Sequence, residues 1–293
     1  MSNCGQDERF LQDLSSIQWR RFEPLNPVPL SLRIFRRPKT LEMLFRELYY
    51  APDSRETLVY IFGELFDDDG QRAESCSAAI PFLGRLLRLV DDPVVPVLMD
   101  CLVALGVGFE NECLEAGGVA GAASFDLPCY RAVEREAYRF TFFLDHPEVV
   151  IRLMACRALA WFPSHASFAV DAIRRLSQRG NEEEQVASFV TRGLIRDPVE
   201  LDDCRSSRVQ LAKAIAHGEC YGLEESSFSF LLKACEASSS FECEPFGFSL
   251  ATYAAELLLR SGDWLEKFLV LVKSGPIVDE IHRLRYLASS WSS

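Results

Sequence analysis

The stretch DHPEVVIRLMACRALAWF, residues 145–162, repeats apolar side chains at spacings of three and four. This spacing places the apolar side chains on one face of an α-helix, where they can be buried together. The preceding segment YRAVEREAYRFTFFL, residues 130–144, is also amphipathic, and Asp145–His146–Pro147 lies between the two as a short polar connection. A proline is tolerated at the start of a helix, because its missing N–H would have no partner there. The pattern therefore predicts a helical hairpin.

The same arrangement occurs earlier in the chain. The segment DDPVVPVLMDCLVALG, residues 91–106, aligns with the stretch that starts at Asp145, with Asp91 over Asp145 at an offset of 54 residues. It also follows a helical pattern, AIPFLGRLLRLV, residues 79–90. Because the likeness covers two helices and their turn, the hairpin is one copy of a repeat.

A weaker third copy follows, with predicted helices at 166–180 and 183–195. Val186 lies 35 residues after Ile151, its counterpart in the previous copy. Helical pairs that repeat every 33–47 residues or so are typical of an α-solenoid. Further apolar periodicity predicts five more helices, at residues 208–218, 227–237, 248–261, 263–273 and 277–288.

These residues resemble the HEAT repeat, in which a helix of the form P-x-L-x-x-L-L is followed by a turn with Asp and a V/I-R-x-x-A-x-x-A-L helix. The matching residues are Pro81-Phe82-Leu83, Leu86-Leu87, Asp145, Ile151-Arg152, Ala155 and Ala158-Leu159. The chain is similar to bacterial HEAT-repeat proteins of about this length over residues 40–218. The resemblance implies an all-α fold, an α-solenoid of HEAT-like helical pairs wound into a right-handed superhelix. The motif arginine at Arg152 is replaced by Leu98 and Ala187 in the flanking copies, so an Asp–Arg ladder along the stack would be discontinuous.

The domain organisation follows from this interpretation. Residues 1–40 form a segment rich in proline and arginine that we expect to pack on the first repeat, although it could instead be a docking strand. Residues 41–293 form a single HEAT-like solenoid domain. It carries an insertion loop near residues 107–130, and the helix at 277–288 caps its C-terminal end.

Charge and cysteine usage narrow the class of protein. The 43 acidic and 31 basic side chains give a net charge of -12, which repels a phosphate backbone and is compatible with a basic protein partner. The same charge also serves simply to keep a protein in solution. The ten cysteines are scattered without a C-x-x-C pair, which indicates reduced thiols in a cytoplasmic protein. Neither a signal peptide nor a membrane span is expected.

Motifs for metal, nucleotide or nucleophilic chemistry are weak. The four histidines have no partner at metal-ligand spacing, so no metal site is expected. The segment GGVAGAASFDLPCY, residues 117–130, lacks the lysine of a phosphate-binding loop. Asp67-Asp68-Asp69-Gly70 lacks the ligand pattern of an EF-hand, so a polar turn is expected there. The sequence therefore predicts no cofactor and no catalytic residue.

The leading functional hypothesis is a non-enzymatic scaffold that binds a protein partner, because HEAT arrays present the second helix of each pair along an extended surface. Its narrower form is an immunity protein that binds and neutralises a basic toxin domain, with electrostatic steering of the encounter. Predicted solvent-facing contact residues on the second helices are Arg152, Arg157, Trp161 and Arg192. Predicted contact residues of the acidic insertion are Glu110, Glu112, Glu115 and Asp126. For Trp161, packing into the next repeat is the alternative.

A second hypothesis is an enzyme. HEAT-like DNA glycosylases use the same architecture to hold damaged DNA, and this requires a basic concave groove with aromatic residues and a carboxylate. The net charge of -12 argues against this or another enzyme that acts on nucleic acid. A third class, HEAT-like chaperones or lyases for tetrapyrrole attachment, has no specific residue in its favour.

Overall fold

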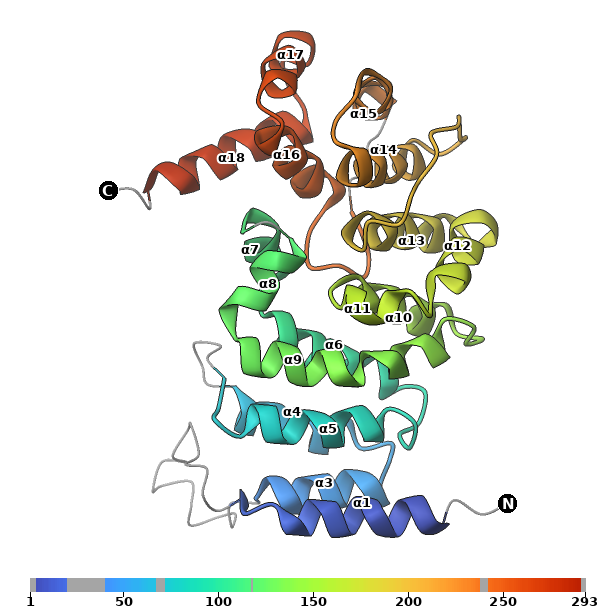
Figure 1. Cartoon of the computed structure of the whole chain (residues 1–293), viewed down its shortest axis with the longest axis vertical. Helices are drawn as coiled ribbons and strands as arrows, with labels where there is room; N and C mark the ends of the chain where they lie inside the picture. Colours follow the sequence, from blue (N-terminus) through green and yellow to red (C-terminus); the bar gives the residue numbers. More distant parts are fainter. Residues whose placement is uncertain (1–3, 20–39, 67–71, 117, 238–241, 291–293) are drawn as a thin grey trace. The chain divides into compact units, whose positions relative to one another are not determined.

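The computed structural model describes residues 4–19, 40–66, 72–116, 118–237 and 242–290. Within these residues all regular secondary structure is helical, with one isolated bridge between Phe66 and Arg72. The all-α fold class is therefore confirmed for the described part of the chain (Figure 1). None of its helices is long and apolar enough to cross a lipid bilayer.

The chain divides into two compact units. Unit 1 is Met1–Gly106 together with Asp126–Arg139, and unit 2 is Val107–Phe125 together with Phe140–Ser293. The segment Val107–Phe125 thus interrupts unit 1 in the sequence but belongs to unit 2 in space.

Unit 1 is a stack of helices around an aromatic core. Its helices are α1 (Cys4–Ser16), α3 (Leu41–Tyr50), α4 (Arg55–Leu65), α5 (Cys76–Leu86), α6 (Val95–Val107, which ends at the unit boundary) and α9 (Leu127–Glu136). Helix α1 packs on α3 and α5, α3 packs on α4, and α5 packs on α9. Phe10, Trp19, Phe45 and Phe82 are buried in this unit, and the ring centroid of Phe82 lies less than 6 Å from those of the other three.

Unit 2 contains most of the remaining helices. They are α7 (Glu110–Glu115), α8 (Val119–Phe125), α10 (Val149–Ala160), α11 (Pro163–Ala166), α12 (Val170–Arg179), α13 (Glu182–Leu194), α14 (Ser207–Tyr221), α15 (Glu225–Ala237), α16 (Leu250–Arg260), α17 (Asp263–Leu271) and α18 (Pro276–Ser290). A 3-10 helix, η2 (Ala137–Phe143), crosses the unit boundary. Helix α13 packs on α10, α12 and α14, α14 packs on α15 and α16, and α16 packs on α18 (Figure 1).

Local sequence explains where the helices of unit 2 begin. Asn181 caps α13, and its side chain accepts the N–H of Glu184 at 2.9 Å while the Glu184 carboxylate accepts the N–H of Asn181 at 2.9 Å. This capping box satisfies two N–H groups that a helix start leaves without partners. Ser206 and Ser249 cap α14 and α16 in a simpler way. The helices predicted at 166–180 and 183–195 are confirmed as α12 and α13.

The insertion loop predicted near residues 107–130 is wrong in its conformation. The segment forms α7 and α8 and then leads into α9. Cys113, Leu114 and Ala122 are buried, and α7 packs on α16 in unit 2. Burial of these apolar side chains stabilises the two short helices, which periodicity over so few residues could not reveal.

Two other predictions fall partly or wholly outside the described residues. In the N-terminal segment, residues 4–16 form α1, which the sequence had not predicted, whereas residues 20–39 are outside the description. Residues 67–70, predicted as a polar turn, are also outside it.

Candidate functional site

Most of the predicted contact residues lie in unit 2, where their charged side chains pair with other residues of the chain. Asp126 lies in unit 1 instead. The buried carboxylates include those of Glu110, Glu184 and Asp197, and each of these three accepts hydrogen bonds from arginine.

Glu110, the first residue of α7, receives three donors from two distant parts of unit 2. One carboxylate oxygen accepts the Arg157 Nε–H at 3.0 Å and the Trp161 Nε1–H at 2.5 Å. The other oxygen accepts the backbone N–H of Gly247, in the turn before α16. Arg157 lies in the last turn of α10 and Trp161 is its C-cap residue, so both donors point from one end of that helix.

The carboxylate and the indole of the Glu110 network are buried, whereas Gly247 is exposed. Glu110 and Trp161 are 4% and 0% exposed, and the Arg157 side chain is 13% exposed. A Cβ atom at Gly247 would lie 2.6 Å from the Glu110 carboxylate, so the close approach of this backbone requires glycine. The prediction that Trp161 and Arg157 face solvent is therefore wrong. The Arg157 and Trp161 side chains donate hydrogen bonds to the Glu110 carboxylate, which lies 47 and 51 residues away from them in sequence.

Arg152 is also engaged inside the fold. Its Nε–H donates to the Glu184 carboxylate at 2.5 Å, and its Nη1 donates to the carbonyl oxygens of His146 and Pro147. The contact joins α10 to the capping box of α13, so Arg152 ties one helical hairpin to the next. Burial, assisted by the Glu184 charge, raises the pKa of the neighbouring Cys156 thiol to about 12, and the Arg152 charge opposes this effect.

The Asp197 network follows the C-terminal end of α13. The N–H of Arg196 donates to the Gly193 carbonyl at 3.0 Å, and the N–H of Asp197 donates to the Arg192 carbonyl at 2.8 Å. These two bonds define a Schellman motif, in which the residue after the C-cap adopts the left-handed conformation. Arg196 has φ = 56°, whereas glycine is the usual residue at this place.

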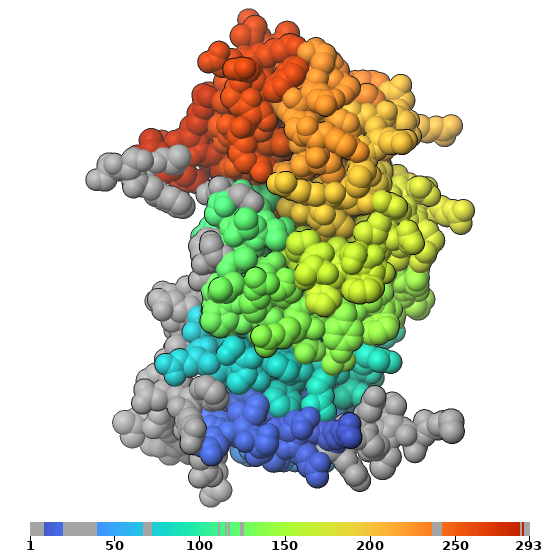
Figure 2. All heavy atoms as spheres, viewed as in Figure 1, coloured from blue at the N-terminus to red at the C-terminus, as the bar shows by residue number. Residues whose placement is uncertain are grey.

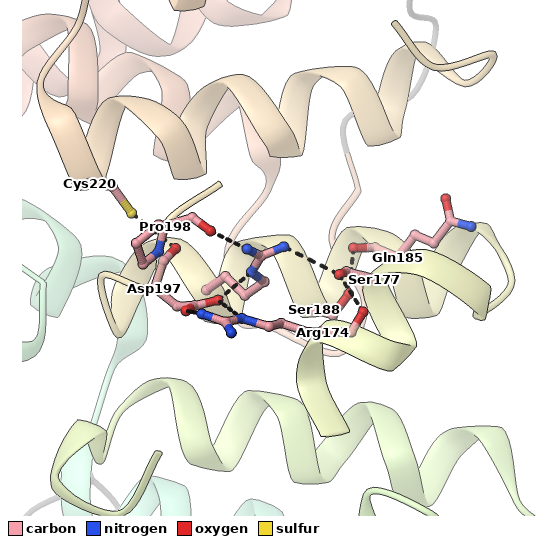
Figure 3. Close-up of polar contacts among 8 residues, drawn as sticks. Arg174, Ser177, Gln185, Ser188, Asp197, Pro198 and Cys220 are labelled. Carbon is pink, nitrogen blue, oxygen red and sulfur yellow. Dashed lines mark hydrogen bonds and ion pairs between the residues drawn. The ribbon is translucent and has the colours of Figure 1, made fainter. Parts of the chain in front are cut away.

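Two arginines share the Asp197 carboxylate. Arg192 donates its Nε–H to Oδ2 at 2.6 Å, and Arg174, on α12, donates its Nε–H to the same oxygen at 3.2 Å and Nη2 to Oδ1. Figure 3 shows Arg174 reaching Asp197, with Ser177 and Pro198 beside them. Arg192 also donates to the Pro198 carbonyl, and its side chain is only 12% exposed, so the prediction that Arg192 faces solvent is wrong.

The acidic residues predicted for the insertion have different environments. Asp126 caps α9 by accepting the Cys129 N–H at 3.1 Å, and it pairs with Arg72 at 3.5 Å. Glu112 is exposed, and the side chain of Glu115 lies outside the described residues. Glu110 is buried, so the prediction that it contributes to an exposed negative face is wrong.

The thiols and histidines of the described residues form no group of metal-ligand type. No group of three or more His, Cys, Asp or Glu side chains among these residues could hold a metal ion. Burial raises the pKa of the Cys101 and Cys243 thiols and, to about 11, that of Cys220. A raised pKa keeps the thiol protonated near neutral pH and lowers its nucleophilicity.

Sequence reasoning missed the partners that complete these networks: Asp197, Glu184, Gly247, Arg174 and Arg196. The N-E-E-E run at the start of α13 carried a usable signal, because Asn followed three residues later by Glu is a capping box. Arg196 carried a misleading one, since a helix end of this kind normally shows glycine. Gly247 had none, because its contact spans 137 residues of sequence.

No protein-family model, curated protein or solved structure matches the chain.

Proposed function

We propose that the chain is a HEAT-like α-solenoid, wound as a right-handed superhelix, that acts as a non-enzymatic scaffold for a protein partner. The observation that carries this proposal is the packing order in unit 2, where α12 packs on α13, α13 on α14 and α14 on α15. Packing between sequence neighbours is characteristic of repeat arrays, and such arrays bind partners along extended surfaces.

The engagement of charged side chains within the fold supports a structural role for them. Glu110, Arg152, Arg157 and Glu184 are used to connect one helix to another. The surface of unit 2, in contrast, carries large apolar side chains such as Phe168, which is 81% exposed. We take Phe168 as the contact residue to test, because an exposed aromatic side chain can contribute a large contact area to an interface.

The test is to isolate a partner and then rebuild the complex from purified components. The tagged chain would be used to capture proteins from the organism that produces it. The stoichiometry of the rebuilt complex would then be measured by size-exclusion chromatography with light scattering. We expect a stoichiometric complex that Phe168→Ser weakens while the helical circular dichroism spectrum is unchanged. Trp161→Ala is unsuitable as a contact variant, because Trp161 is buried and its loss would disturb the fold.

The partner's nature separates the forms of the proposal. A partner with toxin activity that the chain suppresses would establish the narrower role of an immunity protein. Retention of nucleic acid alone, or release of alkylated bases from DNA by the purified chain, would contradict the scaffold and favour the glycosylase alternative.

A further inference from the structure

At the end of α13, Arg174 and Arg192 share the Asp197 carboxylate, and Arg196 is the residue before Asp197 in sequence. We define the arginine corner as Arg174, Arg192, Arg196 and Asp197. Arg192 is largely buried, and its donors are used by Asp197 and Pro198. Arg174 is held by Asp197 but its side chain is 44% exposed, and Arg196 is exposed. Two guanidinium groups of the arginine corner, those of Arg174 and Arg196, therefore face solvent.

The backbone of Arg196 indicates that its side chain has a use. Among the described residues it is the non-glycine residue with a positive φ. A side chain in the left-handed region costs about 1–2 kcal/mol, which glycine would avoid. No hydrogen bond or ion pair with another described residue involves the Arg196 guanidinium, so a contact within the fold does not account for the arginine. A backbone outlier of this kind is a reason to look for a binding role.

The charges around the corner leave it positive. Asp171 lies near Arg174, Arg175 pairs with Asp145 at 3.3 Å, and Arg179 extends the exposed face of α12. Glu219, near the thiol of Cys220, is already paired with Arg260. The stretch that contains α12 and α13, yellow in Figure 2, lies at the surface of the face shown. A local excess of arginine on a chain with a net charge of -12 is a specific electrostatic feature.

We propose that the arginine corner binds carboxylate side chains from an acidic segment of a protein partner, with Arg174 and Arg196 as the contact residues. The planar guanidinium forks match the geometry of carboxylates, and Asp197 holds Arg174 in place before the partner arrives. A short peptide with a few carboxylates fits two exposed guanidinium groups better than a nucleic acid, because a continuous phosphate backbone brings more negative charge against a chain with a net charge of -12 and against Asp171 and Asp197. The expectation of a basic partner concerns long-range steering, whereas this proposal concerns one local contact.

This inference rests on the proposed scaffold function, and a defined probe tests it separately. The probe is a short fluorescein-labelled peptide that alternates Glu and Ser, and its affinity for the full chain would be measured by fluorescence anisotropy at low salt. A peptide with Gln in place of Glu is the matched control ligand. We expect Arg174→Gln and Arg196→Gly each to weaken binding of the Glu peptide by about five- to tenfold. Arg285→Gln, an equal loss of charge on the exposed face of α18, should leave it within about twofold.

Arg196→Gly separates binding from folding. Glycine relieves the left-handed strain, so its unfolding midpoint should rise while its affinity for the Glu peptide falls. The proposal is overturned if the Glu peptide does not bind, if the Gln peptide binds equally well, or if Arg285→Gln matters as much as Arg196→Gly. Stronger, Arg196-dependent binding of a single-stranded DNA oligonucleotide would also overturn it in favour of a phosphate ligand. If a captured protein partner binds independently of both arginines, the proposed role of the arginine corner is wrong, whereas the proposed scaffold function is supported.

Discussion

Unit 2 contains two carboxylate networks that use the same kinds of residue in opposite ways. At Glu110, donors from α10 and from the turn before α16 surround a carboxylate that is 4% exposed. At Asp197, the carboxylate is as well buried, at 6%, but one of its arginines is 44% exposed and a further arginine stands beside it in a left-handed conformation.

The difference separates a structural contact from a candidate binding contact. The Glu110 network joins segments 47 to 137 residues apart, and both carboxylate oxygens are used, so an added ligand would have to break existing bonds. The Asp197 network is local, spanning 23 residues at most to its arginines, and it holds cations that still face solvent. We therefore interpret the buried Glu110 network as a contact that stabilises the fold, and the exposed arginine held by Asp197 as a candidate binding contact.

The largest expected effect is the loss of the Glu110 carboxylate. Glu110→Ala removes the buried carboxylate that accepts the Arg157 Nε–H and the Trp161 Nε1–H, and breaking such a pair costs about 3–5 kcal/mol. Urea unfolding followed by circular dichroism would measure the change in the free energy of unfolding. Glu112→Ala, on the same short helix but exposed, is the control and should change stability by about 0.5 kcal/mol or less. Equal effects of the two variants would show that the Glu110 network is not a structural connection.

Alkaline pH should also distinguish the networks. Cys243 is fully buried near Glu110 and its pKa is raised by burial, whereas Cys220 at the Asp197 network is half-buried with a pKa raised to about 11. Above about pH 9 the unfolded chain loses these thiol protons while the folded chain keeps them, so stability falls as pH rises. The fall is about 1.4 kcal/mol per pH unit for each fully buried thiol.

Urea unfolding at several values between about pH 8 and pH 11 tests this. Cys243→Ala should flatten the dependence more than Cys220→Ala, because the Cys220 thiol is only half-buried. The prediction is contradicted if the free energy of unfolding does not change over this range, or if Cys220→Ala flattens its pH dependence more than Cys243→Ala does.

A smaller effect is expected from Gly247→Ala. The added methyl group would lie 2.6 Å from the Glu110 carboxylate, so the backbone N–H must move away from its acceptor. Such overpacking costs about 1–3 kcal/mol. In the Glu110→Ala background the clashing atom is absent, and the same substitution should cost much less. Additive costs in this double-mutant cycle would show that the two residues do not interact.

The smallest effect should have the opposite sign. Arg196→Gly removes the strain of a left-handed arginine but makes the unfolded chain more flexible, and the net result should be a gain of about 0.5–1 kcal/mol. Arg196→Ala is the matched control, since it removes the charge and keeps the strain, and it should give no gain. Thermal unfolding of the three proteins decides between strain and charge as the cause.

The helices were predictable because their signals are local. The limits of α12 and α13 lie within four residues of those expected from periodicity, and the Asn181 capping box explains the start of α13. The segment 107–125 was not predictable in the same way. Its helices are six and seven residues long, too short to show a period or to be stable alone.

The contact residues were the harder problem. Arg and Trp are residue types that are common at interfaces, which favours a contact role for Arg152, Arg157 and Trp161. Residue type does not reveal the hydrogen-bond acceptors that the folded chain places beside these side chains. Glu184, Glu110 and the carbonyls of residues 146 and 147 became those acceptors only after α7, α10 and α13 were packed together. The functional hypothesis of a protein-binding scaffold stays a prediction.

By itself, the sequence determined the helical character of the chain and many helix boundaries, because apolar spacing and capping side chains act over a few residues. Tertiary structure alone decided that Val107–Phe125 belongs to unit 2, that Trp161 is buried, and which charges are paired. Those outcomes depend on contacts between residues far apart in sequence, whose free energy exists only once the helices have packed.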